Sequence, residues 1–65
     1  MLGHIKFFLA EKGYGYIRVA ATYEEFFFQQ KDLKSPVAKG DSVQFRLKED
    51  RHGVRAVDIL LVAQS

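Results

Sequence analysis

The residues Lys12-Gly13-Tyr14-Gly15-Tyr16-Ile17 alternate large rings with glycine and then an aliphatic side chain. Successive side chains of a β-strand point to opposite faces, so Tyr14 and Tyr16 share one face. Gly15 lies on the other face, where a second segment can approach the backbone closely. The pattern predicts a strand at Tyr14–Val19 with an aromatic outer face and a core-facing inner one.

The rest of the chain reads as four further short strands separated by turn residues. We predict these strands at Gly3–Leu9, Glu25–Gln29, Ser42–Lys48 and Val54–Val62. The connections between the five strands are Glu11–Gly13, Ala20–Glu24, a loop at Lys31–Asp41 with one helical turn at Lys31–Leu33, and a hairpin turn at Asp50–Gly53.

Five short strands in a chain of this length favour a closed structure, because an open sheet would leave long edges and one bare apolar face. We therefore predict an all-β fold, a five-stranded antiparallel OB-type barrel. Apolar and polar residues alternate along Ser42–Lys48, which predicts that Val43, Phe45 and Leu47 face the core. The core candidates in the last strand are Ile59 and either Ala56 or Val57.

Length and composition limit the function classes. The chain has 65 residues and contains no cysteine, which excludes disulfides and cysteine-ligated zinc. No apolar run approaches the roughly 18 residues of a membrane span, and no signal-peptide pattern precedes the first strand. We expect one domain, residues 1–65, without a membrane segment, in the reducing cytoplasm. The net charge of +2 is a weak indication of an anionic partner.

The second aromatic run, Phe26-Phe27-Phe28, extends the outer face of the first. If Phe26 and Phe28 enter the core, Phe27 points outward beside the two tyrosines. Lys6 and Phe7 can share that face only if a bulge or a strong twist near Phe7 and Phe8 interrupts the alternation. The expected surface consists of Phe7, Tyr14, Tyr16 and Phe27, rimmed by Lys6, Lys12 and Arg18.

Other interpretations of these residues remain open. Phe7 could enter the core with Phe8 outside, and the exposed rings could serve only as stabilising cross-strand pairs. Lys12 and Arg18 could simply be solvated. An exposed aromatic cluster flanked by cations nevertheless suits single-stranded nucleic acid, because bases stack on rings and cations hold phosphates.

At these residues the chain resembles the cold-shock protein family. Residues 3–17 are similar to the opening stretch of the family, and residues 12–17 resemble its first ribonucleoprotein motif. Residues 25–29 resemble the second motif, and residues 39–45 and 53–59 are similar to the last two strands. The resemblance implies a five-stranded OB-type barrel that binds single-stranded RNA or DNA, often acts as an RNA chaperone, and needs no cofactor. It implies base stacking by Phe7, Tyr14, Tyr16 and Phe27, with Lys6 and Lys12 near the backbone.

The chain also departs from the pattern of the family. The family usually has Trp at the place of Phe7, Asn at Leu9, His at Gln29 and Phe at Gln30. Gln29 and Gln30 therefore become candidates for hydrogen bonds to bases, although Gln30 could instead only cap the turn. The Lys31–Asp41 loop is shorter than usual by roughly four residues and has no aromatic residue. We expect a smaller binding surface and a weaker affinity than in a typical member, partly offset by the positive net charge.

Other function classes have less support. Neither histidine, His4 or His52, has metal-ligand spacing, and no nucleophile motif or catalytic pair is present, so we expect neither an enzyme nor a metal site. Two alternatives remain: a small barrel that binds peptides of a protein partner, and a relative that has lost general nucleic-acid binding and modulates a regulatory complex. We expect a monomer, with a strand-swapped dimer as a hypothesis that follows from the short loop.

Overall fold

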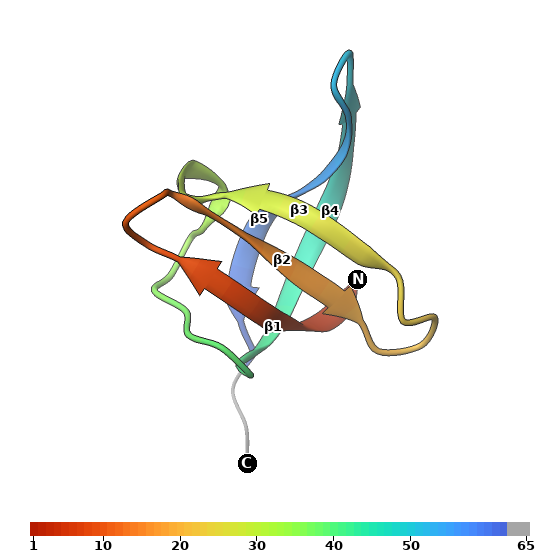
Figure 1. The fold of residues 1–65 in the computed structure, drawn as a ribbon. Coiled ribbons are helices and arrows are strands. Elements are labelled where there is room, and N and C mark those ends of the chain that lie inside the picture. Colours follow the sequence, from red (N-terminus) through yellow and green to blue (C-terminus); the bar gives the residue numbers. More distant parts are fainter. Residues whose placement is uncertain (63–65) are drawn as a thin grey trace.

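The computed structural model describes residues 1–62, which form five strands and one turn of 3-10 helix (Figure 1). The strands lie within two residues of the predicted ends, and the helical turn begins one residue earlier than predicted. Their bounds are β1 (Leu2–Leu9), β2 (Tyr14–Val19), β3 (Glu25–Gln29), η1 (Gln30–Asp32), β4 (Ser42–Asp50) and β5 (Gly53–Leu61).

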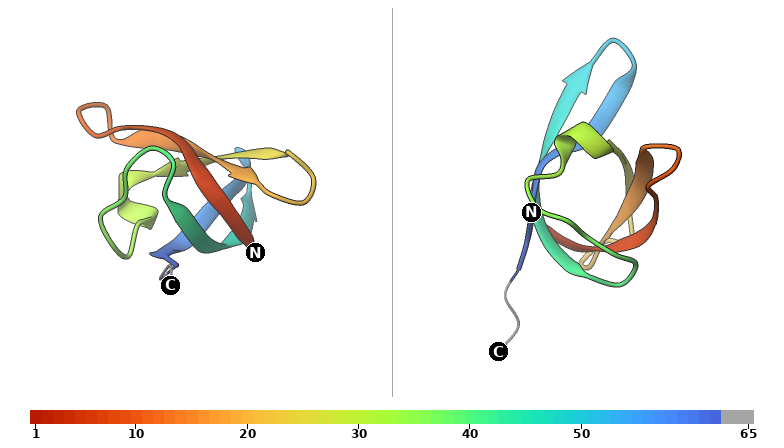
Figure 2. Two further views of the ribbon diagram at one scale, coloured as in Figure 1. Left: turned by 90° about the horizontal axis from the view of Figure 1, so that it is seen from below. Right: turned by 90° about the vertical axis from the view of Figure 1, so that its left-hand side faces the viewer.

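The strands close into a barrel in the order β1-β2-β3-β5-β4, which confirms the OB-type architecture. The right-hand view of Figure 2 looks into this ring, with the tip of the β4–β5 hairpin projecting beyond it. Four of the five pairings are antiparallel. The fifth joins β3 and β5 in parallel through Phe27 and Arg55. The barrel is therefore not wholly antiparallel, because strand directions cannot alternate around a closed ring with an odd number of members.

The core is a single cluster of aliphatic and aromatic side chains inside the barrel. Phe28 and Phe45 are its largest members, and Phe26 packs against it while half-buried. Its buried members are Ile5, Ile17, Val19, Phe28, Val43, Phe45, Ala56 and Ile59.

The prediction for Leu47 was wrong, since its side chain is 38% exposed. Leu47 pairs with Ala56 in the part of the β4–β5 hairpin that leads toward the projecting tip. Alternation assigned Leu47 to the inner face, but the barrel wall that would cover it does not extend that far.

An irregularity in β5 explains why the sequence left Ala56 and Val57 as alternatives. Both are buried. Between the pairs Gln44–Leu60 and Arg46–Val57, β4 has one residue and β5 has two, which is a β-bulge. Asp58 lies in this bulge with φ of 51°, a left-handed conformation that Asp adopts more readily than most residues.

The connection from η1 to β4 is hydrogen-bonded to the barrel at both ends. Leu33 forms a bridge with Ile59, and the N–H of Lys34 donates to the carbonyl of Ile59 over 2.8 Å. At the other end, the N–H of Gly40 donates to the carbonyl of Ile5, also over 2.8 Å. The short loop is therefore fixed against β5 and β1.

Candidate functional site

A β-bulge in β1 determines which side chains reach the outer face. Ile5 pairs with Ile17 and Phe7 pairs with Tyr16, so Lys6 is an extra residue without a partner in β2. The predicted irregularity is confirmed, one residue before its expected position. Beyond it Phe7 points outward, while the ring of Phe8 lies 5.7 Å from that of Phe28, measured between centroids. The interpretation that placed Phe7 in the core is therefore wrong.

Four rings form a closed set of contacts on the outer face of β1, β2 and β3. The ring centroids of Phe7 and Tyr16 are 5.4 Å apart, and those of Phe7 and Tyr14 are 6.3 Å apart. Phe27 lies 5.8 Å from Tyr14 and 5.9 Å from Tyr16. All four are half-buried, so each ring keeps surface that solvent can reach. We call this set of Phe7, Tyr14, Tyr16 and Phe27 the aromatic platform.

Gly15 allows the platform and the core to lie on opposite sides of one strand. It is buried and pairs with Phe28 on β3 and with Phe8 on β1. A Cβ atom there would meet the carbonyl oxygen of Phe7 and would lie 2.7 Å from the ring of Phe28. Only a residue without a side chain lets Phe28 pass beneath β2 at this point.

One edge of the platform carries a three-membered ion cluster. The ammonium of Lys6 lies 2.9 Å from one carboxylate oxygen of Glu25, and the guanidinium of Arg18 lies 2.7 Å from the other. Hydrogen bonds from Arg18, and next from Lys6, lower the pKa of Glu25 below its ordinary value. Alternation along β3 puts Glu25 on the same face as Phe27, but the sequence did not identify Glu25 as the partner of both cations.

Lys12 lies in the β1–β2 turn and is exposed. Gly13 follows it with φ of 78°, which completes the turn, and the N–H groups of both residues donate to the carbonyl of Leu9. Among residues 1–62 no carboxylate forms an ion pair with Lys12, so its charge is available to a ligand.

The two glutamines predicted as site residues lie on different sides of the platform. Gln29 is half-buried and pairs with Tyr14 at the end of β3. It lines a depression of about 220 Å³ between Phe27 and the β4–β5 turn, which we call the hairpin pocket. Gln30 is exposed at the start of η1, and its N–H donates to the carbonyl of Gly13.

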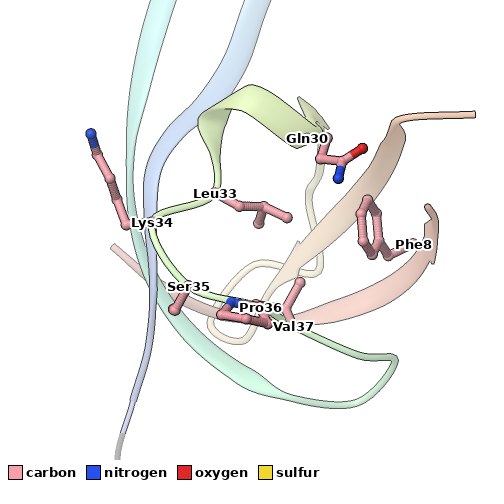
Figure 3. A pocket seen from close by; sticks show the side chains of 7 residues that line it. All are labelled: Phe8, Gln30, Leu33, Lys34, Ser35, Pro36 and Val37. Carbon is pink, nitrogen blue, oxygen red and sulfur yellow. The ribbon is translucent and has the colours of Figure 1, made fainter.

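Gln30 lines a second depression of about 380 Å³, the loop pocket, together with Phe8 and residues 33–37. Figure 3 shows the amide of Gln30 near the ring of Phe8, with Pro36 and Val37 on the opposite side. The side chain of Lys34 points away from this pocket in the same view. The loop pocket is therefore mainly apolar, with one amide at its edge.

A second ion cluster, which sequence reasoning did not identify, joins η1 to the β4–β5 hairpin. Arg55 donates from Nε to Asp32 over 3.2 Å and from Nη1 to Asp50 over 2.7 Å. Asp32 is buried and also accepts the N–H of Gln29 over 3.1 Å. Asp50 and Arg55 are five residues apart in one hairpin, but Asp32 is 23 residues from Arg55, so no local pattern in the sequence predicts that all three meet.

Within residues 1–62, no group of three or more His, Cys, Asp or Glu side chains is arranged to hold a metal ion. The same residues include no helix that is both long and apolar enough to cross a membrane.

A family model described as the 'Cold-shock' DNA-binding domain matches residues 1–62. The chain belongs to the cold-shock domain family. The match spans all five strands and every platform residue, so the resemblance inferred from the two aromatic motifs is confirmed. The family is one of nucleic-acid-binding domains, which agrees with the aromatic surface. A comparison with curated proteins found no significant match.

Proposed function

We propose that this cold-shock domain binds single-stranded RNA or DNA on the aromatic platform. The observation that carries the proposal is the closed set of ring contacts among Phe7, Tyr14, Tyr16 and Phe27 on one outer face. Base stacking on such rings contributes about 1–3 kcal/mol per base. The bases must be unstacked to reach the rings, so the ligand is a single strand and not a duplex.

The cations at the rim provide the phosphate contacts in this proposal. Lys12 offers a charge without an ion-pair partner among the described residues, at the end of the platform formed by Tyr14. Lys6 and Arg18 share one carboxylate, so their cluster keeps a net charge of +1. Phosphates that bind these cations release condensed counterions, and the affinity should therefore fall as salt rises.

The departures from the family predict a modest affinity. Phe7 offers a smaller stacking surface than the Trp usual in the family. Gln29 and Gln30 offer hydrogen bonds in place of ring surface. Because the domain binds only unpaired strands, its binding would shift RNA from the paired toward the unpaired state. This shift follows from mass action and needs no catalysis. An RNA-chaperone role is the cellular activity that this property supports.

The test is fluorescence anisotropy of a labelled thymidine heptamer, single-stranded and as a duplex, at two salt concentrations. We expect binding of the single strand only, weaker at high salt. Tyr16→Ala and Phe27→Ala should each weaken binding about tenfold, the loss of one stacked base.

Tyr23→Ala is the matched control, because Tyr23 is 75% exposed in the β2–β3 connection and its ring contacts no other ring within residues 1–62. Equal affinity of all three variants would contradict the proposal. If no oligonucleotide binds at low salt, the function lies instead with peptides of a protein partner.

A further inference from the structure

The hairpin pocket continues the aromatic platform away from β2. Phe27 belongs to both surfaces, and the pocket is otherwise formed by Gln29 and by the β4–β5 turn. Its lining residues are Phe27, Gln29, Asp50, His52, Gly53, Val54 and Arg55. A base stacked beside Phe27 would therefore have polar groups of β5 and the turn within reach of its edge.

Arg55 is held in a fixed position at this pocket. Its backbone pairs with Phe27, and its side chain is bound by Asp32 through Nε and by Asp50 through Nη1. Nη2 has no hydrogen-bond partner within residues 1–62. A guanidinium whose position is already fixed loses little conformational entropy when its remaining N–H groups bind a ligand.

The local charge disfavours a phosphate at the same place. Two carboxylates, Asp32 and Asp50, surround the one guanidinium of Arg55 and leave the cluster with a net charge of −1. A phosphate would meet this excess of negative charge, whereas an uncharged base would not. The cluster therefore suits recognition of a base edge.

The available donors and acceptors favour guanine. Guanine presents two adjacent acceptors, O6 and N7, which arginine recognises more often than any other base edge. Adenine has a donor beside N7, and thymine or uracil has no adjacent pair of acceptors. Cytosine has such a pair, O2 and N3, but on its Watson–Crick edge, whereas guanine presents its pair on one edge and its donors on another. Guanine also has donors on its Watson–Crick edge. The carboxylate of Asp50 lines the pocket and keeps lone pairs beside those that accept Arg55 and the N–H of His52, whereas the side chain of Gln29 already accepts the N–H of Asp32.

From this geometry we infer that the hairpin pocket is a guanine-selective subsite, with Arg55 as the residue that determines the selectivity. The inference rests on the proposed binding of single strands to the platform. It predicts that one position of a bound strand prefers guanine, while neighbouring positions on the platform accept any base.

The first experiment changes the ligand and leaves the protein intact. Thymidine heptamers with one guanine at each position in turn are measured by anisotropy. We expect at least one position where guanine tightens binding about tenfold, the size of one good bidentate contact. At that position inosine should keep the gain, because it retains O6 and N7, whereas 7-deazaguanine and 2-aminopurine should lose it.

The second experiment changes the protein. Arg55→Lys keeps the charge but removes the planar fork, and should abolish the preference for guanine while the all-thymidine strand still binds. Lys48→Gln is the matched control, because Lys48 faces Arg55 across the hairpin and is exposed, and its loss removes a charge without altering the pocket. It should weaken all strands equally and keep the preference. Thermal melting of each variant verifies folding.

The outcomes separate the two proposals. Binding of thymidine strands without any preference for guanine overturns the guanine subsite and leaves the proposed function intact. A preference that survives both 7-deazaguanine and Arg55→Lys, or a preference for cytosine, also overturns it. Failure of every single strand to bind overturns the proposed function itself, and the subsite with it.

Discussion

At the residue scale, Gly15 lets the core ring of Phe28 pack directly beneath β2, the strand that carries Tyr14 and Tyr16 of the platform. We predict that Gly15→Ala lowers the free energy of unfolding by about 3 kcal/mol, the upper range for overpacking a core. The new methyl group would meet the backbone of Phe7 and the ring of Phe28. Urea unfolding followed by circular dichroism measures the loss.

Gly53→Ala is the control for this substitution. Gly53, unlike Gly15, has a positive φ of 109°, and a Cβ there would have no neighbour within 4 Å. Gly53→Ala should therefore lower the free energy of unfolding only through backbone strain, by about 1 kcal/mol, without a steric clash. If Gly15→Ala were as stable as the wild-type protein, the steric role assigned to Gly15 would be wrong.

Local patterns in the sequence predicted the residues of the platform because alternation is a local property. Tyr14 and Tyr16 are two residues apart in one strand, and Phe27 is flanked by two rings that turn inward. Even the β1 bulge could be predicted, because Lys6 and Phe7 could not otherwise share a face. Whether each platform residue contacts a base stays a prediction.

At the scale of elements, Glu25 joins β3 to β1 and β2 through Lys6 and Arg18. The folded pKa of Glu25 lies below its ordinary value of 4.5. This carboxylate therefore stabilises the fold above that pH, and the contribution is lost as pH falls through the lowered pKa. Glu25→Gln should decrease stability at pH 7 and flatten its decline under acid.

Denaturant unfolding at several pH values between 3 and 7 measures this effect. Glu24→Gln is the control, because Glu24 is adjacent and its side chain accepts from Thr22 and pairs with no cation among residues 1–62. A Glu25→Gln protein whose stability follows the same acid profile as the wild-type protein would refute the role of the cluster.

The second cluster fixes η1 and the hairpin relative to each other. We predict that Asp32→Asn lowers the free energy of unfolding by about 2 kcal/mol. The substitution replaces a buried carboxylate, which accepts hydrogen bonds from Arg55 and from the backbone N–H of Gln29, with a neutral amide. Thermal and urea unfolding measure this cost.

Asp58→Asn is the control. Asp58 pairs with Arg46 and Lys34 at the surface, and Asn also tolerates its left-handed backbone. Loss of these surface ion pairs should lower the free energy of unfolding by no more than about 0.5 kcal/mol. Equal costs for the two substitutions would mean that burial of Asp32 adds nothing.

The sequence could not predict these clusters, since each needs one contact between residues far apart in the chain, Lys6 with Glu25 and Asp32 with Arg55. Arg55 meets Phe27 only because β5 runs parallel to β3 at the point of closure. The exposure of Leu47 has a similar origin, because the local alternation of β4 says nothing about how far the barrel wall extends. The alternation of side chains predicts which residues of a strand share a face. Whether that face is buried depends on how the barrel closes around it.

For the molecule as a whole, the closed barrel separates two surfaces. β1, β2 and β3 carry the platform, while β4 and β5 form the other wall, as Figures 1 and 2 show. The short loop between η1 and β4 is hydrogen-bonded to β5 and β1 of its own chain. That the chain is a monomer, and that residues 1–65 form one domain, stay predictions.

The central claim is that the platform is where a single strand binds. Its most direct test is an NMR titration of the ¹⁵N- and ¹³C-labelled protein with a thymidine heptamer. We predict the largest shift changes at the rings of Phe7, Tyr14, Tyr16 and Phe27, with little change at Gln44 and Leu60, which are exposed on the β4–β5 wall. Changes concentrated at Gln44 and Leu60, with the four rings unaffected, would contradict it.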